Sequence, residues 1–153
     1  MDGMTAKEFL LQPARARVRL EMALLQRDAL KSLTERVTQT FGIQTPGVHT
    51  QNYSAMEDAV IRLTEAEEMV EKKMKELAEA ELEVGMVLAM IPDKTLNEYM
   101  VKRYLENQSI RKASEEMNFT KGWGEKKQRK GIEAVQRILD EKGYASIRKV
   151  YAP

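Results

Sequence analysis

The densest run of basic side chains lies between Thr120 and Lys130, in the sequence TKGWGEKKQRK. It holds five lysines and arginines and one acid, Glu125. Cations on a helix neutralise phosphates, and side chains near the start of a helix in the major groove read base edges. The run therefore predicts contact with double-stranded DNA, with Thr120 as the residue that opens the helix.

The ten candidate contact residues are Thr120, at the start of this helix, and nine further residues in three groups. The candidates for base reading are Lys121, Trp123 and Lys126. The candidates for contact with the DNA backbone are Lys127, Arg129 and Lys130. At the start of the preceding helix, where the helix end favours anions, the candidates for further phosphate contacts are Ser109, Arg111 and Lys112.

A structural interpretation of the same residues stands beside this one. A basic run is often only a solvated helix face, and Trp123 also suits a packing role. Gly122 and Gly124 each cost about 0.8–1.0 kcal/mol relative to alanine inside a helix. The start of this helix is therefore expected to be weak, and it could order only on DNA.

Other chemistries have little support in the sequence. The sole histidine, His49, lies in a Gly/Pro-containing stretch without a second metal ligand, which favours a loop residue over catalysis or zinc binding. A carboxylate-rich stretch comprises Glu65, Glu67, Glu68 and Glu71. Because it lacks an ExxH pair, we interpret it as the solvated face of a helix and not as a metal site. Nucleotide-binding glycine motifs are absent from the sequence. We expect neither an enzyme nor a cofactor.

Composition and charge agree with a helical, DNA-binding chain. Of the 153 residues, 42% are hydrophobic and 32% charged, and there is no cysteine, which suits a reducing cytoplasm. No stretch is apolar enough to cross a membrane. Basic and acidic residues number 7 and 5 in residues 1–53, 4 and 10 in 54–92, and 14 and 9 in 93–153. The basic end suits a polyanionic partner.

A seven-residue repeat of apolar side chains predicts one long helix in the middle of the chain. Its members are Met56, Leu63, Val70, Leu77, Val84 and Ile91. Ser54 with Glu57 three residues later forms a capping-box pattern that should begin this helix, and Pro92 should end it.

A weaker repeat predicts a helix in the first third of the chain: Phe9, Ala16, Ala23, Leu30 and Val37. Because Pro13 is tolerated best in a first turn, we expect a short segment to Gln12 and a main helix from there to about Thr40. A loop over residues 41–53 would let the two helices fold back as an antiparallel hairpin. A homodimer through the same stripes is an alternative, and both can hold at once.

Three shorter helices are predicted after Pro92. The first covers Thr95–Leu105, the second is capped by Ser109 and runs to about Met117, and the third is capped by Thr120. Asn118 tolerates a left-handed backbone and suits the turn between the second and third. Gly143 should end the last helix. This short connection is typical of a helix-turn-helix.

Residues 91–139 resemble the helix-turn-helix of sigma factor region four, as found in phage late transcription regulators of the ArpU and RinA type. The matching features are Pro92, the sequence Arg103-Tyr104-Leu105, Ser109, Ala113 and the turn Met117-Asn118-Phe119-Thr120. The segment MTAKEFLLQ at residues 4–12 and the start near Tyr53-Ser54 also resemble these proteins. The resemblance implies a phage-encoded, sequence-specific activator of late genes that acts in the cytoplasm of the bacterial host cell and also contacts RNA polymerase.

The sequence thus predicts an all-α chain with a coiled-coil-like helical hairpin over residues 1–91 and a helix-turn-helix domain over residues 92–153. Its expected role is a DNA-binding transcription regulator. Two other roles stay open. One is a DNA-packaging subunit similar to a small terminase, which a ring of subunits in solution would indicate. The other is an adaptor that docks on RNA polymerase without binding DNA.

Overall fold

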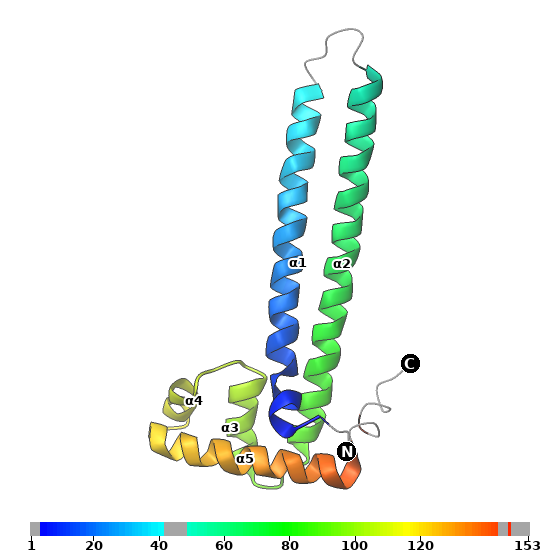
Figure 1. The fold of residues 1–153 in the computed structure, drawn as a ribbon. Helices are drawn as coiled ribbons and strands as arrows, with labels where there is room; N and C mark the ends of the chain where they lie inside the picture. Colours follow the sequence, from blue (N-terminus) through cyan, green and yellow to red (C-terminus); the bar gives the residue numbers. More distant parts are fainter. Residues whose placement is uncertain (1–3, 42–48, 144–146, 148–153) are drawn as a thin grey trace. The chain divides into compact units, whose positions relative to one another are not determined.

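Helices make up most of the part of the chain that the structure describes. The computed structural model describes residues 4–41, 49–143 and 147, with the backbone alone for 40, 41 and 49–53. The helices are α1 (Ala6–Phe41), α2 (His49–Ala89), α3 (Lys94–Tyr104), α4 (Ile110–Glu116) and α5 (Lys121–Lys142) (Figure 1). No strand occurs among these described residues. The predicted all-α class is confirmed.

A reciprocal cap begins α1. The Glu8 amide donates to Thr5 Oγ1 at 3.2 Å, and the Thr5 amide donates to a Glu8 carboxylate oxygen at the same distance. The two side chains thereby satisfy two amide donors that a helix start leaves without a partner. The Ala6 amide donates to Gln136 Oε1 of α5 at 2.9 Å. This capping box fixes the first turn of α1 and was not predicted.

The predicted break at Pro13 is wrong, because α1 runs without interruption from Ala6 to Phe41 with Pro13 inside it. A proline within a helix removes one amide donor and crowds the carbonyl four residues earlier, at a cost of about 3 kcal/mol. Pro13 is itself fully buried, and so are Phe9 and Leu10 in the preceding turn. Packing around the proline offsets its local cost.

The predicted start of the second helix at Ser54 is also wrong. The helix α2 begins at His49, so Ser54 lies inside it and does not cap it. No glycine or proline follows Gly47 before Ser54, and a cap contributes only about 1 kcal/mol, so the helix extends past it. His49 consequently belongs to a helix and not to a loop, while its side chain and residues 42–48 lie outside the described residues.

The long middle helix and its apolar stripe are confirmed. The helix α2 ends at Ala89, and a turn through Met90 and Ile91 precedes Pro92. Every member of the seven-residue repeat is shielded at least in part. The buried members are Val70, Val84 and Ile91, and the half-buried members are Met56, Leu63 and Leu77.

The chain divides into two compact units. The first joins Met1–Ala16 to Leu77–Pro153, and the second is Arg17–Glu76. This division differs from the expected boundary after residue 91. The cause is Ile91, Val84 and Leu88 at the end of α2, whose buried side chains belong to the same core as those of α3 and α5.

The start of α1 contributes to the core of the first unit. Phe9 and Leu10 are 0% and 1% exposed and belong to one cluster with Tyr99, Met100 and Val135. Residues more than 80 positions apart in sequence therefore share one apolar core. The apolar repeat that begins at Phe9 predicted a helix, but it did not indicate that Phe9 packs in one core with residues of α3 and α5.

In the second unit, α1 and α2 contact each other. Thr34 Oγ1 donates to the carbonyl of Leu30 in its own helix at 2.8 Å, and it also lies 3.4 Å from the carbonyl oxygen of Ala59 in α2. Ala23 and Ala59 are buried in this unit.

Candidate nucleic-acid interface

Three local caps fix where α3, α4 and α5 begin. The side chains of Asp93, Ser109 and Thr120 accept hydrogen bonds from the amides three residues later, at distances of 3.1, 3.1 and 3.2 Å. The predictions for Ser109 and Thr120 are confirmed, whereas Asp93 was not predicted. Because each cap is local, the sequence around it carries the signal.

The connection between α4 and α5 is four residues long. Asn118 has φ of 62°, in the left-handed region where asparagine is favoured among the residues other than glycine. The amides of Asn118 and Phe119 donate to the carbonyls of Glu115 and Ser114, at 3.0 and 2.9 Å. These bonds satisfy carbonyls at the end of α4 and turn the chain sharply. The predicted turn at Asn118 is confirmed.

Gly124 allows α5 to approach α4 closely. A Cβ atom at this position would lie 2.0 Å from Ser114 Oγ and 3.1 Å from Ile110 Cγ2, both side chains of α4. Ser114 is fully buried. The glycine that sequence reasoning treated as a weakness of α5 is therefore the residue that lets the two helices pack. Gly122 differs, because a Cβ there meets only ordinary contact with Thr120.

Gln128 joins the inner face of α5 to α3. Its Oε1 accepts a hydrogen bond from Arg103 Nε at 3.0 Å, and its Nε2 donates to the hydroxyl of Tyr104. Arg103 Nη1 also donates to the carbonyl of Gln108 at 2.7 Å. Burial raises the pKa of the Tyr104 hydroxyl. This polar network sets the orientation of α5 on α3 and leaves the opposite face of α5 exposed.

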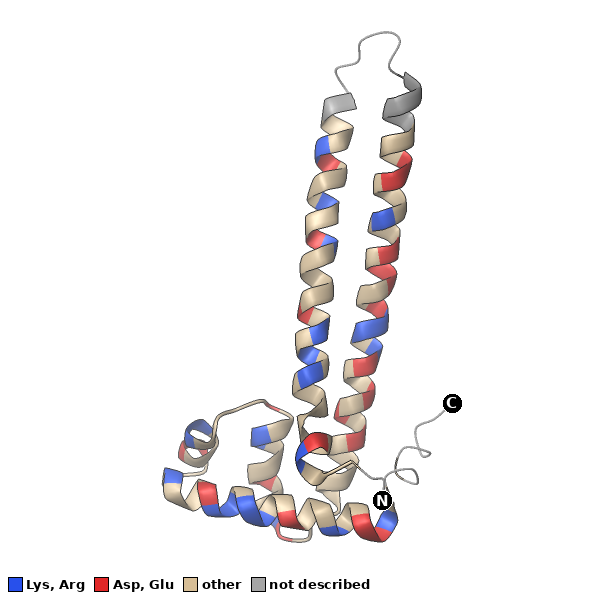
Figure 2. Cartoon of the chain, in the orientation of Figure 1, with Lys and Arg blue, Asp and Glu red and all other residues tan. Residues whose placement is uncertain are grey.

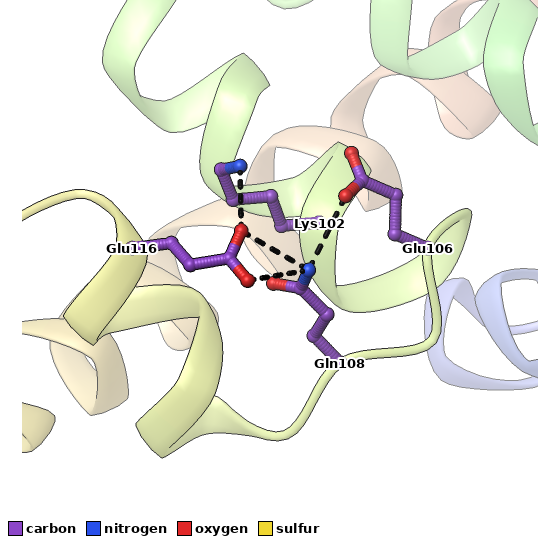
Figure 3. Close-up of polar contacts among 4 residues, drawn as sticks. All are labelled: Lys102, Glu106, Gln108 and Glu116. Carbon is purple, nitrogen blue, oxygen red and sulfur yellow. Dashed lines mark hydrogen bonds and ion pairs between the residues drawn. The ribbon is translucent and has the colours of Figure 1, made fainter.

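A second polar cluster joins α3 to α4 (Figure 3). Lys102 Nζ lies 3.1 Å from a Glu116 carboxylate oxygen, and Gln108 Nε2 donates to both oxygens of that carboxylate, at 3.0 and 3.2 Å. Gln108 Nε2 also donates to Glu106. The hydrogen bonds from Gln108 and Lys102 lower the pKa of Glu116, and the bond to Glu116 raises the pKa of Lys102.

The lowered pKa of Glu116 predicts a pH dependence of stability. A carboxyl whose folded pKa lies below its unfolded pKa stabilises the fold above the unfolded pKa, about 4.3 for glutamate, and this contribution is lost as the pH falls through the folded pKa. We expect Glu116→Gln to lower the melting temperature at neutral pH, by a small amount because the pair is exposed. The difference from the unmodified protein should disappear in acid.

Circular dichroism melts between neutral pH and about pH 3 would measure this difference. Glu115→Gln is the matched control, because Glu115 is an exposed neighbour on the same helix for which the structure records no side-chain partner. A Glu116→Gln effect that stayed constant over the whole pH range would show that the ion pair does not contribute.

Three of the predicted DNA-contact residues present free cations on α5. Lys126, Arg129 and Lys130 are exposed, and among the described residues their side chains have no hydrogen bond or ion pair. Figure 2 shows the charges of α5, which are mostly basic over residues 121–130 and mixed over residues 131–142. These three residues form the basic face, the name kept below.

The other predicted contacts on α5 are partly engaged. Lys121 Nζ lies 3.9 Å from Glu125, an exposed pair that contributes little. Trp123 is half-buried, stacks on Phe119 with ring centroids 3.9 Å apart, and meets Tyr99 edge-on at 5.6 Å. Trp123 of α5 therefore packs against both the turn before α5 and helix α3. This is the packing role that the sequence analysis gave as the alternative to base reading.

The remaining predicted contacts lie on or beside α4 and α5. Lys127 is half-buried, with its Nζ 5.7 Å from the centre of the Trp123 ring. The hydroxyls of Ser109 and Thr120 serve as helix caps. Arg111 and Lys112 are exposed on α4. Among the described residues, five of the ten candidates are exposed cations whose side chains form no hydrogen bond or ion pair: Arg111 and Lys112 at the start of α4, and Lys126, Arg129 and Lys130 on α5.

Arg137 was not among the predicted contacts. It is exposed and lies seven residues after Lys130, which is four residues after Lys126, so the three share one side of α5. This spacing is visible in the sequence and could have identified it. By contrast, the support that Gln128 gives to α5 depends on Arg103 and Tyr104 of another helix, for which the sequence carries no signal.

The described residues offer neither a metal-binding cluster nor a membrane-spanning helix. Over residues 4–41, 49–143 and 147, no cluster of three or more histidine, aspartate or glutamate residues could hold a metal ion. None of the helices described is both long enough and apolar enough to cross a membrane.

Comparison with models of known protein families, with curated proteins and with solved structures found no match for this chain. The candidate interface therefore stands on its own residues and geometry.

Proposed function

We propose that this protein binds double-stranded DNA through a helix-turn-helix formed by α4 and α5, with α5 in the major groove. The observation that carries the proposal is the basic face. Three exposed cations that have no side-chain partner in the described part of the chain lie on α5, while the opposite side of the helix is fixed by Gly124 and Gln128. A rigid helix with one free cationic side suits a groove lined by phosphates.

The turn before α5 supports the same proposal. Thr120 begins α5 beside the exposed Lys121, so the first amides of α5, which a helix start leaves without a partner in the helix, lie near a cation. Helix starts of this kind favour phosphate contacts, and side chains in the first turns reach base edges. Lys121 and Lys126 are the proposed base readers, and Arg129, Lys130 and Arg137 the proposed phosphate contacts.

The resemblance to sigma factor region four extends the proposal to a phage regulator of late genes that also contacts RNA polymerase. In that role α1 and α2 form a helical hairpin that serves as an arm for a partner. DNA binding is the part of this proposal that a direct experiment can test.

The test is the affinity for a labelled DNA duplex of mixed sequence, measured by fluorescence anisotropy over a range of salt concentrations. Neutralising the basic face with Lys126→Gln, Arg129→Gln and Lys130→Gln should weaken binding strongly at low salt. Each phosphate that the variant no longer neutralises should lower the slope of log affinity against log salt concentration by about 0.9.

A matched control removes three exposed lysines elsewhere in the same unit, with Lys7→Gln, Lys94→Gln and Lys142→Gln. Both variants lose the same net charge, so only a local contact predicts different affinities. Equal affinities for the two variants would reject the basic face as the contact surface. A lack of binding to any duplex at low salt would reject DNA binding altogether.

A further inference from the structure

Phe119 differs from the other apolar side chains around α3, α4 and α5. Over residues 93–143, all of which the structure describes, it is the one large apolar side chain that is exposed, at 43%. Every other apolar side chain of these three helices is buried or half-buried. The cations of the basic face suit phosphates, but they do not account for an uncovered phenyl ring in this region.

Phe119 lies directly before the cap of α5. Its amide donates to the carbonyl of Ser114 at 2.9 Å, and the next residue, Thr120, begins α5. In a helix-turn-helix the side chains at the start of the second helix are the ones that reach base edges in the major groove. In the proposed complex with DNA, Phe119 is therefore placed near the bases.

The phenyl ring is also close to the basic face. It stacks on Trp123, with ring centroids 3.9 Å apart and an angle of 12° between the ring planes. Trp123 precedes Lys126 and Lys130 by three and seven residues, and these spacings place the three residues on one side of a helix. The exposed aromatic ring and two cations of the basic face thus share one side of the helix-turn-helix.

Contacts within the chain hold the ring in place before any DNA binds. Trp123, on which Phe119 stacks, meets Tyr99 of α3 edge-on at 5.6 Å, and Lys127 Nζ lies 5.7 Å from the centre of the Trp123 ring. A side chain that is already ordered loses little conformational freedom on binding. Phe119 therefore suits a contact that depends on the shape of a base.

The major groove offers one kind of apolar partner for such a ring. Hydrogen-bond donors and acceptors line the base edges, and the C5 methyl of thymine is the apolar group among them. Phenylalanine is one of the side chains that contact this methyl. Burial of one methyl-sized apolar group favours binding by about fourfold.

We infer that Phe119 contacts the C5 methyl of a thymine and gives the protein a preference for thymine at one position of its DNA site. The inference rests on the proposed DNA binding and deepens it. The basic face supplies affinity for duplexes in general, and Phe119 supplies part of the choice of sequence. Uracil in place of this thymine keeps the base pair and removes only the methyl group, so the replacement isolates the contact.

The test uses duplexes that the full, unmodified chain selects from a random-sequence library. Each thymine of a selected duplex is replaced in turn by uracil, and the affinity is measured by fluorescence anisotropy. At least one replacement should weaken binding by about fourfold. For Phe119→Ala, the same replacement should have no effect, because the side chain that contacts the methyl is gone.

The matched control is Leu82→Ala, which removes an apolar side chain that is 53% exposed on α2 in the same unit. This variant should keep the fourfold ratio between the thymine and uracil duplexes. If Phe119→Ala does not fold, 5-iodouracil in place of the sensitive thymine keeps the test. Ultraviolet light should then cross-link this base to Phe119 of the unmodified protein.

Three results would overturn the inference. They are a selected duplex in which no uracil replacement changes the affinity, a thymine preference that persists in Phe119→Ala or is lost in Leu82→Ala, and a cross-link to another residue. Each of them leaves the proposed DNA binding intact, because the protein still binds the duplex. A chain that binds no duplex at low salt would instead reject DNA binding, and the thymine contact with it.

Discussion

Phe9→Ala is expected to lower the free energy of unfolding by about 3–5 kcal/mol. The Phe9 ring is 0% exposed and lies in the core of the first unit with Tyr99 and Val135. Its removal takes apolar area out of burial and leaves a cavity that the surrounding helices fill only in part. The effect should reach α5, although that helix begins more than 100 residues later in the chain.

Urea denaturation followed by tryptophan fluorescence would measure this loss, because Trp123 is the only tryptophan and lies at the start of α5. Leu11→Ala is the control on the same helix, with a side chain that is 40% exposed. It should cost much less. If the Trp123 transition were the same in Phe9→Ala and in the unmodified protein, the N-terminal turns would not belong to the core that supports α5.

Gly124→Val is expected to destabilise the first unit by up to about 3 kcal/mol. The new Cβ would overlap Ser114 Oγ and press on Ile110, and Ser114 is fully buried with its hydroxyl donating to the Ile110 carbonyl at 2.7 Å. The helices α4 and α5 would have to separate. DNA binding through α4 and α5 should weaken in parallel.

The same substitution at Gly122 provides the control, because a Cβ there meets open space apart from an ordinary contact. Gly122→Val should change stability by no more than about 0.5 kcal/mol. Adding Ser114→Gly to Gly124→Val removes the closest clash and should restore part of the loss, which a double-mutant cycle would measure. Thermal melts that rank the two glycine variants equally would argue against the close crossing.

Capping residues show both the strength and the limit of local sequence patterns. Ser109 and Thr120 cap their helices as predicted, because the hydroxyl and the amide that it accepts from are three residues apart. The same pattern at Ser54 does not begin a helix, whereas the pattern of Thr5 with Glu8 three residues later does. A cap contributes about 1 kcal/mol, so the neighbouring residues decide whether the helix stops there.

Within the candidate interface, the basic run and its helix could be predicted, whereas the use of each side chain could not. Lys126 and Lys127 are neighbours in sequence, yet one is free in solvent and the other lies over the Trp123 ring. From sequence alone, Gly124 is expected to destabilise α5, because glycine has a low helix propensity. The contact with Ser114 that explains it comes from a different helix.

The sequence by itself determined the helical class, the long stripe of α2, the turn at Asn118 and the basic character of α5, since each depends on residues within a few turns of one another. Tertiary structure decided that the start of α1 joins the core of the C-terminal helices and that Pro13 stays inside a helix. It also decided which of the described lysines are exposed and which pack against a ring. The physical reason is that burial depends on which distant surfaces meet, and the free energy of that burial exceeds the small local preferences that a sequence pattern records.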